Sequence, residues 1–430
     1  MAAAIALAGG CGSHAPPAGY ASTDSGAGGS PPGSTDAATS YVPPLESDAS
    51  LICSHPDCDG DGYATPADCN DDNAQVNPEA YDFIGDGIDN DCDGKVDDPV
   101  VNCETTPASP PGTPTDFARA ADLCAQRSKT NAGTVFDPVI KAAWGAVSGT
   151  SGTQVNTSTT KTEQVNIVSA FGQNGPQSGT TMFGLSNGPW GATDPRSSPA
   201  LDPAGFHLDD ACADIPLMGL DCDALTGNSP VGAVSVQDWG ELTLWVQVPS
   251  NVSGVHFDFM FFSSEFNQWW NSSANDAFFA LVSSKELSGA NVARDTHGLA
   301  ITVNSDFFQL CPASPGPAGL ATVKSEALQQ CVGVAGSTTQ GIAGTLAGTG
   351  YDGAAVGSND TVQAVDGSEY IYGGGSGWLT TSFGVTPGEQ LQLRIVIMDT
   401  FDGLKDSVVL IDNFGWDATQ TPVGVTRPPK

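Results

Sequence analysis

Residues 241–262 read ELTLWVQVPSNVSGVHFDFMFF, and apolar side chains recur at every second position on both sides of the PSN turn signal. A period of two is typical of β-strands that bury one face. The run Met260–Phe262 is apolar on both faces, which indicates a central strand. The alternation returns at residues 391–397. The large C-terminal region is therefore predicted to consist of strands.

Clusters of Gly, Pro, Asn and Ser separate these strands, and residues that favour helices are sparse. Together these features predict a mainly β protein in which residues 135–418 form a jelly-roll-like antiparallel β-sandwich. Because the strands are well separated in the sequence, we expect long-range pairing. Asp412 precedes Asn413 and is expected in a turn. Two disulfides, Cys212–Cys222 and Cys311–Cys331, are each expected to close a short loop. Each would stabilise the folded state by about 2–4 kcal/mol.

The 430 residues carry 49 acidic and 14 basic side chains, which gives a net charge of −35. Such a chain repels phosphate backbones and anionic lipids, so nucleic-acid binding is not expected. The length allows two or three domains. Eleven cysteines spread along the chain are typical of an oxidising compartment outside the cytoplasm.

Residues 1–11 (MAAAIALAGGC) are apolar as far as Cys11 and too few to span a bilayer. They resemble a lipoprotein signal peptide whose cleavage leaves a lipidated Cys11, although no Lys or Arg precedes the apolar run. An ordinary secretion signal and a chance apolar tip are the alternatives. Setting Cys11 aside leaves ten cysteines, an even number that fits five disulfides. Membrane contact is therefore expected only through a lipid anchor, with the chain on the cell envelope facing the periplasm or the exterior.

Three segments have the amino-acid composition of linkers or tails. Residues 12–50 are rich in Gly, Pro, Ser and Ala and are predicted to be a disordered tether. Residues 105–134 contain the linker PASPPGTP and then a short helix, which Thr113 caps and which begins at Pro114. Residues 419–430 are predicted to be a tail.

The run DCDGDGYATPADCNDDNAQVNPEAYDFIGDGIDNDCDGKVDD, residues 57–98, holds thirteen aspartates and one glutamate against a single lysine. Carboxylates at this density repel one another unless a cation lies among them. Asp57, Asp59, Asp61 and Asp68 occupy positions 1, 3, 5 and 12 of a calcium loop, where alternate carboxylates converge on one ion. The core D-x-D-x-D-G is repeated at residues 89–94. The predicted ligands are Asp57, Asp59, Asp61, Tyr63 and Asp68 in the first array, and Asp89, Asp91, Asp93, Lys95 and Asp97 in the second.

A solvated acidic spacer is the alternative to calcium binding. Against it, the aspartates alternate in register with glycine, and Cys58, Cys69 and Cys92 are embedded in the run. Position 12 is an aspartate in place of the usual glutamate, and no helical pattern precedes Asp57, so paired EF-hand helices are not expected. This segment looks more like a thrombospondin type 3 repeat, in which the chain wraps around ions and disulfides replace a hydrophobic core.

The blocks ADCNDD, VNPEA and DGIDNDCDG resemble the metal-binding motif of bacterial, especially myxobacterial, surface proteins. The resemblance implies a calcium-type, disulfide-stapled module, residues 51–104, joined to a larger extracellular domain. A few relatives of this motif have been linked to copper. Oxygen-only ligands suit calcium, and His55 is the only imidazole near the arrays.

Six cysteines in and around this module allow about 15 pairings. Cys69 and Cys92 each follow a proposed ligand, and a bond between them would clamp the end of one loop against the centre of the other. The remaining pairs would then be Cys53–Cys58 and Cys103–Cys124.

Two later passages, residues 257–282 and 373–416, resemble the choice-of-anchor L domain. The matching marks are Ser264-Glu265, residues 275–278 (NDAF), and the series Asp399, Asp402, Asp406, Ser407. Phe266 stands where the family commonly has a second glutamate. The resemblance implies a β-sandwich of bacterial surface proteins with no established catalytic activity.

Carboxylates at strand ends, if buried among so few basic residues, need a cation or backbone amides. A second metal site is therefore expected at one rim of the sandwich, with turn capping as the alternative. The candidate ligands are Glu265, Asp276, Asp402 and Asp406.

The chain contains neither G-x-S-x-G nor H-E-x-x-H, so we expect no enzyme of those types. The sequence favours a non-enzymatic, calcium-binding cell-surface lipoprotein that contacts a surface or matrix ligand, carbohydrate included. The alternative is a carbohydrate-binding module or a glycosidase, with Glu265 and Asp276 as paired carboxylates and Trp269 and Trp270 as a stacking surface.

Overall fold

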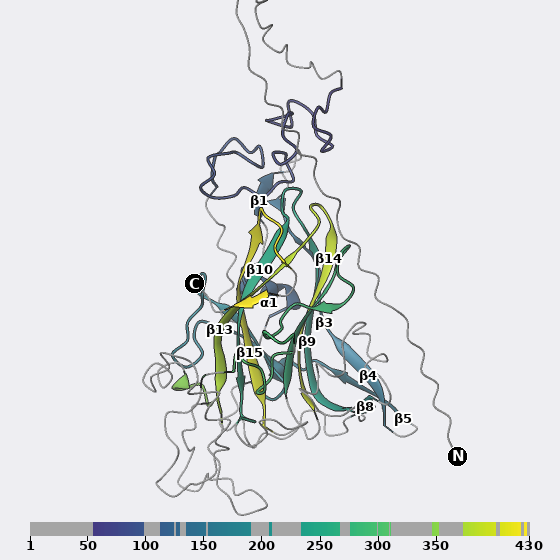
Figure 1. Ribbon diagram of the computed structural model, residues 1–430, viewed down its shortest axis with the longest axis vertical. Coiled ribbons are helices and arrows are strands. Elements are labelled where there is room, and N and C mark those ends of the chain that lie inside the picture. The colour runs from purple at the N-terminus through teal and green to yellow at the C-terminus, as the bar shows by residue number, and fades with distance from the viewer. Residues whose placement is uncertain are drawn as a thin grey trace, which may run out of the picture. The chain divides into compact units, whose positions relative to one another are not determined.

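The computed structural model describes residues 55–98, 112–123, 126–129, 135–151, 154–190, 206–208, 234–266, 276–298, 300–308, 310, 346–351, 373–400, 405–422 and 425–427. Two antiparallel sheets dominate this part of the chain, and little of it is helical. Figure 1 shows the long strands β9, β10, β13, β14 and β15 running along one another. The predicted mainly β sandwich is confirmed.

The first sheet has six strands. In spatial order they are β16 (Val425–Arg427), β13 (Gly375–Gly384), β10 (Gly254–Ser263), β15 (Ser407–Asp417), β7 (Met182–Ser186) and β6 (Val165–Val168).

The second sheet has eight strands. Seven lie in the order β12 (Ala290–Asn291), β11 (Ala277–Ser283), β14 (Gln390–Thr400), β9 (Val234–Gln247), β8 (Phe206–Leu208), β4 (Ala146–Ser151) and β5 (Gln154–Thr159), and β3 (Val139–Trp144) also pairs with β9. The 3-10 helix η1 (Thr162–Gln164) leads into β6, and β1 (Gln126–Lys129) pairs with β2 (Val135–Phe136) in a small separate sheet.

Long-range pairing builds both sheets, as expected. Strand β10 lies between β13 and β15, and β9 pairs with β14, more than a hundred residues later. The two strands of the sequence ELTLWVQVPSNVSGVHFDFMFF do not pair with each other, because β9 and β10 belong to different sheets. The β9–β10 turn, residues 248–253, therefore carries the chain from one layer to the other.

Alternation along β10 divides its side chains between two apolar clusters. Val255, Phe257, Phe259 and Phe261 are fully buried in the main core between the sheets. Met260 and Phe262 point to the other face, where they form a second cluster with residues that include Tyr351 and Leu410. Both faces of β10 are thus covered, which confirms the prediction of a central strand.

The expectation of a turn at Asp412 is wrong, because Asp412 lies within β15 and is fully buried. The adjacent Asn413 has a φ of 52°, and the register between β10 and β15 shifts between His256 and Asp258. The turn-forming residue is therefore accommodated as a β-bulge inside the strand.

Helix α1 (Pro114–Ala120) begins at the proline, as predicted, with Thr113 at its N-cap. The Thr113 N–H donates to the Asp116 carboxylate at 2.7 Å. Phe117 is fully buried, and its ring lies edge-on to Trp144 and Phe183 at centroid distances of 5.0 and 5.2 Å. A helix expected within a linker is thus part of the sandwich core.

The Asp-rich module, described for residues 55–98, contains turns and bends but no helix or strand. Its own buried apolar side chains are few, chiefly Val76 and Ala80. Tyr81 and Phe83 pack against the main core of the sandwich. Ser250 in the β9–β10 turn donates its N–H to the Glu79 carbonyl at 3.1 Å. Part of the apolar packing of the module is therefore provided by the core of the sandwich.

Candidate metal centres

The first array gathers three carboxylates, because Asp57, Asp59 and Asp61 each place an oxygen within 4.8 Å of the others. Backbone amides fix the loop: Gly60 and Gly62 donate to the two Asp57 oxygens at 2.7 and 3.1 Å. These glycines have φ values of 81° and 102°, a region that L side chains rarely adopt. The spacing of aspartate and glycine in the sequence thus produces a cup of oxygen atoms.

Buried oxygens in this cup lack partners. Among the described residues, no hydrogen-bond donor reaches Oδ2 of Asp59, Asp61 or Asp68, and all three atoms are buried. Burial and the neighbouring carboxylates raise the pKa of Asp61 and of Asp68 above the ordinary value. Buried carboxylate oxygens without hydrogen-bond partners destabilise the folded state unless they coordinate a cation. The arrangement fits a hard divalent ion bound by oxygen atoms.

Asn77, which the ligand spacing did not single out, connects the first array to the sandwich. It is fully buried and lies close enough to Asp61 to affect the pKa of that carboxyl group. Its Oδ1 also accepts the Ser250 hydroxyl at 2.8 Å and the Glu79 N–H at 3.0 Å. Asn77 belongs to the VNPEA block, so this block of the motif was the signal that could have identified it.

The second array brings together Asp89, Asp91 and Asp93, again with one oxygen of each within 4.8 Å of the others. The Asp93 N–H donates to both Asp89 and Asp91 at 3.1 Å. Burial raises the pKa of Asp91 to about 6. The ammonium group of Lys95 contacts Asp93 Oδ2 at 2.6 Å and lies 3.7 Å from Asp98 Oδ1. The second array therefore already contains one positive charge.

Two other aspartates have roles that spacing alone did not indicate. Asp97, a predicted ligand, accepts the N–H groups of Gly85 and Gly87 at 2.8 and 3.1 Å with Oδ1. Asp82 was not predicted, yet it is buried and accepts the N–H groups of Asn90 and Asp98 at 3.2 and 2.6 Å. Burial raises the pKa of Asp82. Asp97 therefore orders the loop at residues 85–87, and Asp82 supports the second array.

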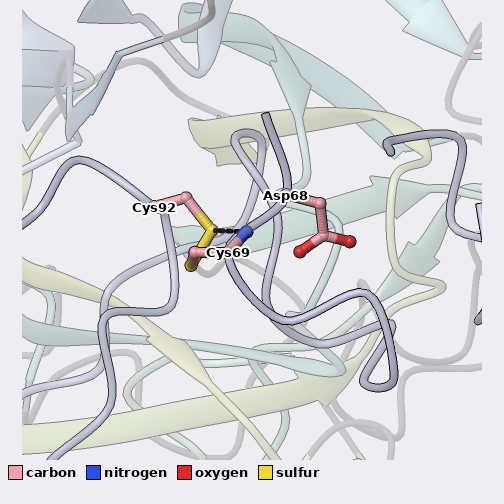
Figure 2. A group of neighbouring side chains, drawn as sticks. All are labelled: Asp68, Cys69 and Cys92. Atoms are coloured by element: carbon pink, nitrogen blue, oxygen red, sulfur yellow. Dashed lines mark hydrogen bonds between the residues drawn. A yellow bond between two sulfur atoms is a disulfide. The ribbon is translucent and has the colours of Figure 1, made fainter. Parts of the chain in front are cut away.

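The predicted disulfide Cys69–Cys92 is confirmed. Figure 2 shows the bond beside Asp68, whose carboxylate points away from the sulfurs. The Cys69 N–H also contacts Cys92 Sγ at 3.0 Å. Cys58 is disulfide-bonded as well. The other predicted cysteine positions, Cys11, Cys53, Cys103, Cys124, Cys212, Cys222, Cys311 and Cys331, lie outside the described residues.

The structure brings three of the four predicted rim carboxylates to one end of the sandwich. Glu265, Asp276 and Asp406 are 1%, 0% and 4% exposed. Glu265 accepts the Asp276 N–H at 2.6 Å, and Asp276 accepts the Ser407 hydroxyl at 2.5 Å. Asp402 lies outside the described residues.

Tyr351 is a buried neighbour of this rim that the sequence did not reveal. Burial, followed by the charges of Asp406 and Asp276, raises its pKa well above the ordinary value. The donors that the structure shows at the rim carboxylates are the Asp276 N–H, which bonds Glu265, and the Ser407 hydroxyl, which bonds Asp276.

Neither carboxylate of the alternative glycosidase pair faces solvent, because Glu265 and Asp276 are both buried. A glycosidase needs its two carboxylates on either side of a bound sugar. Trp269 and Trp270 lie outside the described residues.

Two family models match this chain. Residues 68–98 match the family described as "Putative metal-binding motif", and residues 243–416 match the choice-of-anchor L domain. Both resemblances indicated by the sequence are therefore confirmed, in the same order. The first match starts at Asp68, so Asp57, Asp59 and Asp61 precede it. No curated protein and no solved structure matches the chain.

A metal-binding motif followed by a choice-of-anchor domain indicates a surface-associated, metal-binding protein. In the described part of the chain, no helix is both long and apolar enough to cross a membrane.

Proposed function

We propose that this protein is a non-enzymatic cell-surface protein whose Asp-rich module binds calcium and is thereby held against the β-sandwich. A lipid on Cys11 anchors it to the cell envelope, and the sandwich contacts a surface or matrix ligand.

The observation that carries the calcium proposal is the set of buried oxygens of Asp59, Asp61 and Asp68 that lack hydrogen-bond donors among the described residues. The second array is different, because Lys95 already contacts Asp93. We therefore expect the first array to bind an ion more tightly than the second. A site with only oxygen ligands suits calcium better than the smaller magnesium ion, which requires near-octahedral geometry.

Calcium binding also explains how the module holds together with so few buried apolar residues. Asn77 lies beside Asp61 and accepts the Ser250 hydroxyl, so an ion bound at Asp61 lies next to a residue that contacts the sandwich. Ion binding and docking are then linked, because the free energy of binding contributes to the ordering of the module.

The test is calorimetric titration of the full chain with calcium. Extracellular modules of this kind bind calcium with a dissociation constant on the order of 10⁻⁴–10⁻³ M. We expect Asp68→Asn to weaken the tighter site at least about tenfold, which corresponds to about 1.4 kcal/mol. Asp72→Asn is the matched control, because Asp72 is an exposed aspartate of the same module outside both arrays.

Equal calcium affinity in the wild type and Asp68→Asn would contradict the assignment of the first array. Absence of calcium uptake at millimolar concentration would contradict the calcium proposal as a whole. The ligand of the sandwich is tested separately, by binding of the full chain to matrix material and to a glycan array with and without calcium. Failure to bind either one would contradict the adhesive role.

A further inference from the structure

A second group of possible metal ligands lies on the β12 loop, defined here as residues 292–308 without residue 299. Asp295, His297 and Asp306 each place one ligand atom within 4.8 Å of the others. His297 Nδ1 lies 3.0 Å from Asp306 Oδ1 and 3.9 Å from Asp295 Oδ2. Bonds of about 2.0–2.2 Å to a shared ion would separate ligand atoms by roughly 3.0–3.5 Å. The His297–Asp306 separation lies in this range, and the Asp295 oxygen would have to move by about 0.4 Å to reach it.

The loop that carries these residues is held firmly in the sandwich. Val292 donates its N–H to the Ala280 carbonyl at 2.7 Å, and the Phe278 N–H donates to the Ile301 carbonyl at 2.9 Å. Several loop side chains are buried in the main core: Val292, Ala293, Ile301, Val303 and Phe308. Such anchoring keeps the three ligands in one geometry, which lowers the entropy cost of binding an ion.

Repulsion between the two carboxylates of this group also favours the binding of a cation. The Asp295 side chain is 1% exposed, and a carboxylate oxygen of Asp306 lies within 4.8 Å of one of its oxygens. Two carboxylates this close, one of them desolvated, repel each other unless a proton or a cation lies between them. His297 adds a neutral nitrogen ligand, and its side chain is 73% exposed. Solvent can therefore reach the group on the imidazole side.

We propose that Asp295, His297 and Asp306 bind one divalent first-row transition-metal ion, such as zinc, at a site on the sandwich separate from the Asp-rich module. One imidazole nitrogen with two carboxylate oxygens is a ligand set that suits zinc, iron or nickel, whereas the oxygen-only arrays suit calcium. Three protein ligands leave at least one position for water or for a donor atom of a partner molecule.

The test is calorimetric titration of the full chain with zinc in millimolar calcium, which keeps the Asp-rich module occupied. We expect one zinc site per chain that His297→Ala and Asp306→Asn each weaken at least about tenfold. His55→Ala is the matched control, because His55 is an exposed imidazole next to the first array. A cobalt titration read by visible absorption gives a second readout, because replacing the imidazole changes the spectrum of the bound ion.

Three outcomes would overturn the proposal: no zinc uptake by the wild type in calcium, unchanged affinity in His297→Ala, or loss of the site in His55→Ala. Calcium titration of the same variants separates this proposal from that for the module, because His297→Ala leaves both arrays intact. Far-ultraviolet circular dichroism checks the folding of each variant.

Discussion

The Asn251 side chain pairs with the backbone of Tyr81 as a neighbouring strand would. The Tyr81 N–H donates to Asn251 Oδ1 at 2.7 Å, and Asn251 Nδ2 donates to the Tyr81 carbonyl at 2.8 Å. The two residues are 170 positions apart, and Asn251 is 2% exposed. One amide in the β9–β10 turn therefore holds the centre of the Asp-rich module, next to Asp82.

Asn251→Ala should weaken both the docking of the module and the stability of the protein. It leaves the partly buried N–H and carbonyl of Tyr81 without these partners, and the loss of such partners costs about 1–3 kcal/mol. We expect a corresponding loss in the free energy of unfolding, measured by urea denaturation in saturating calcium. Ser253→Ala in the same turn is the control. If docking and ion binding are linked, Asn251→Ala also weakens calcium binding, and an unchanged calcium affinity would show that they are independent.

Asp412 should make the stability of the sandwich depend on pH. Burial raises its pKa from 3.8 to about 7. Its Oδ2 accepts the N–H groups of Gln177 and Ser178, while its Oδ1 has no donor among the described residues. Because the folded state binds this proton more tightly than the unfolded state, the free energy of unfolding falls as pH rises from about 4 to about 7 and then levels off.

Asp412→Asn should remove this contribution, which is at most about 1.4 kcal/mol per pH unit. The measurement is urea denaturation of both proteins at about pH 5 and about pH 8 in constant, saturating calcium. We expect the variant to gain stability relative to the wild type at the higher pH. Identical pH dependence in the two proteins would show that Asp412 does not titrate in this range.

The sequence predicts the sheets better than it predicts the site, for a physical reason. Burial of one face imposes a period of two, so the alternation at residues 242–248 and 255–261 is visible without any knowledge of pairing. The same applies to β10, whose two apolar faces indicate a central position. Which strands pair is not visible in that pattern, because β9 and β10 have similar alternation and lie in different sheets.

The contacts that organise the metal centres have no such periodic signal. Asn251 and Ser250 look like ordinary turn residues, and their partners in the module are found only in three dimensions. Spacing located Asp89, Asp91 and Asp93 correctly as a group. It could not tell that Asp97 faces the amides of Gly85 and Gly87, or that Asp82 supports the array, because each depends on how the intervening loop folds.

Helix α1 was predicted as part of a linker because of the composition of the sequence around its start. The sequence indicated its start at Pro114 and its cap at Thr113. The preceding PASPPGTP made the segment resemble a linker, although Phe117, Ala118 and Ala121 are buried in the core of the sandwich.

Cys11 should carry a lipid. Replacing it with serine removes the thiol to which the lipid is attached, so Cys11→Ser should move the protein from the membrane fraction to the soluble fraction. The measurement is cell fractionation followed by immunoblotting, with Cys69→Ser as a control for the loss of a different cysteine. A Cys11→Ser variant that fractionates like the wild type would exclude lipid anchoring at this position.

The Cys69–Cys92 disulfide should be coupled to ion binding. It joins the residue after Asp68 in the first array to the residue after Asp91 in the second, across a sequence separation of 23. A cross-link over such a distance restricts the unfolded module by about 3 kcal/mol in the chain-entropy model. Without it, ion binding must supply more of the free energy that orders the loops.

We therefore expect Cys69→Ser combined with Cys92→Ser to lower calcium affinity about tenfold or more, measured by calorimetry on the full chain. The matched control is the double variant Cys212→Ser with Cys222→Ser, which removes a predicted pair in the sandwich region and leaves the module unchanged. Equal calcium affinity in the wild type and the Cys69/Cys92 variant would show that the ions order the loops without help from the cross-link. A similar loss in the control variant would indicate a general effect of lost stability instead.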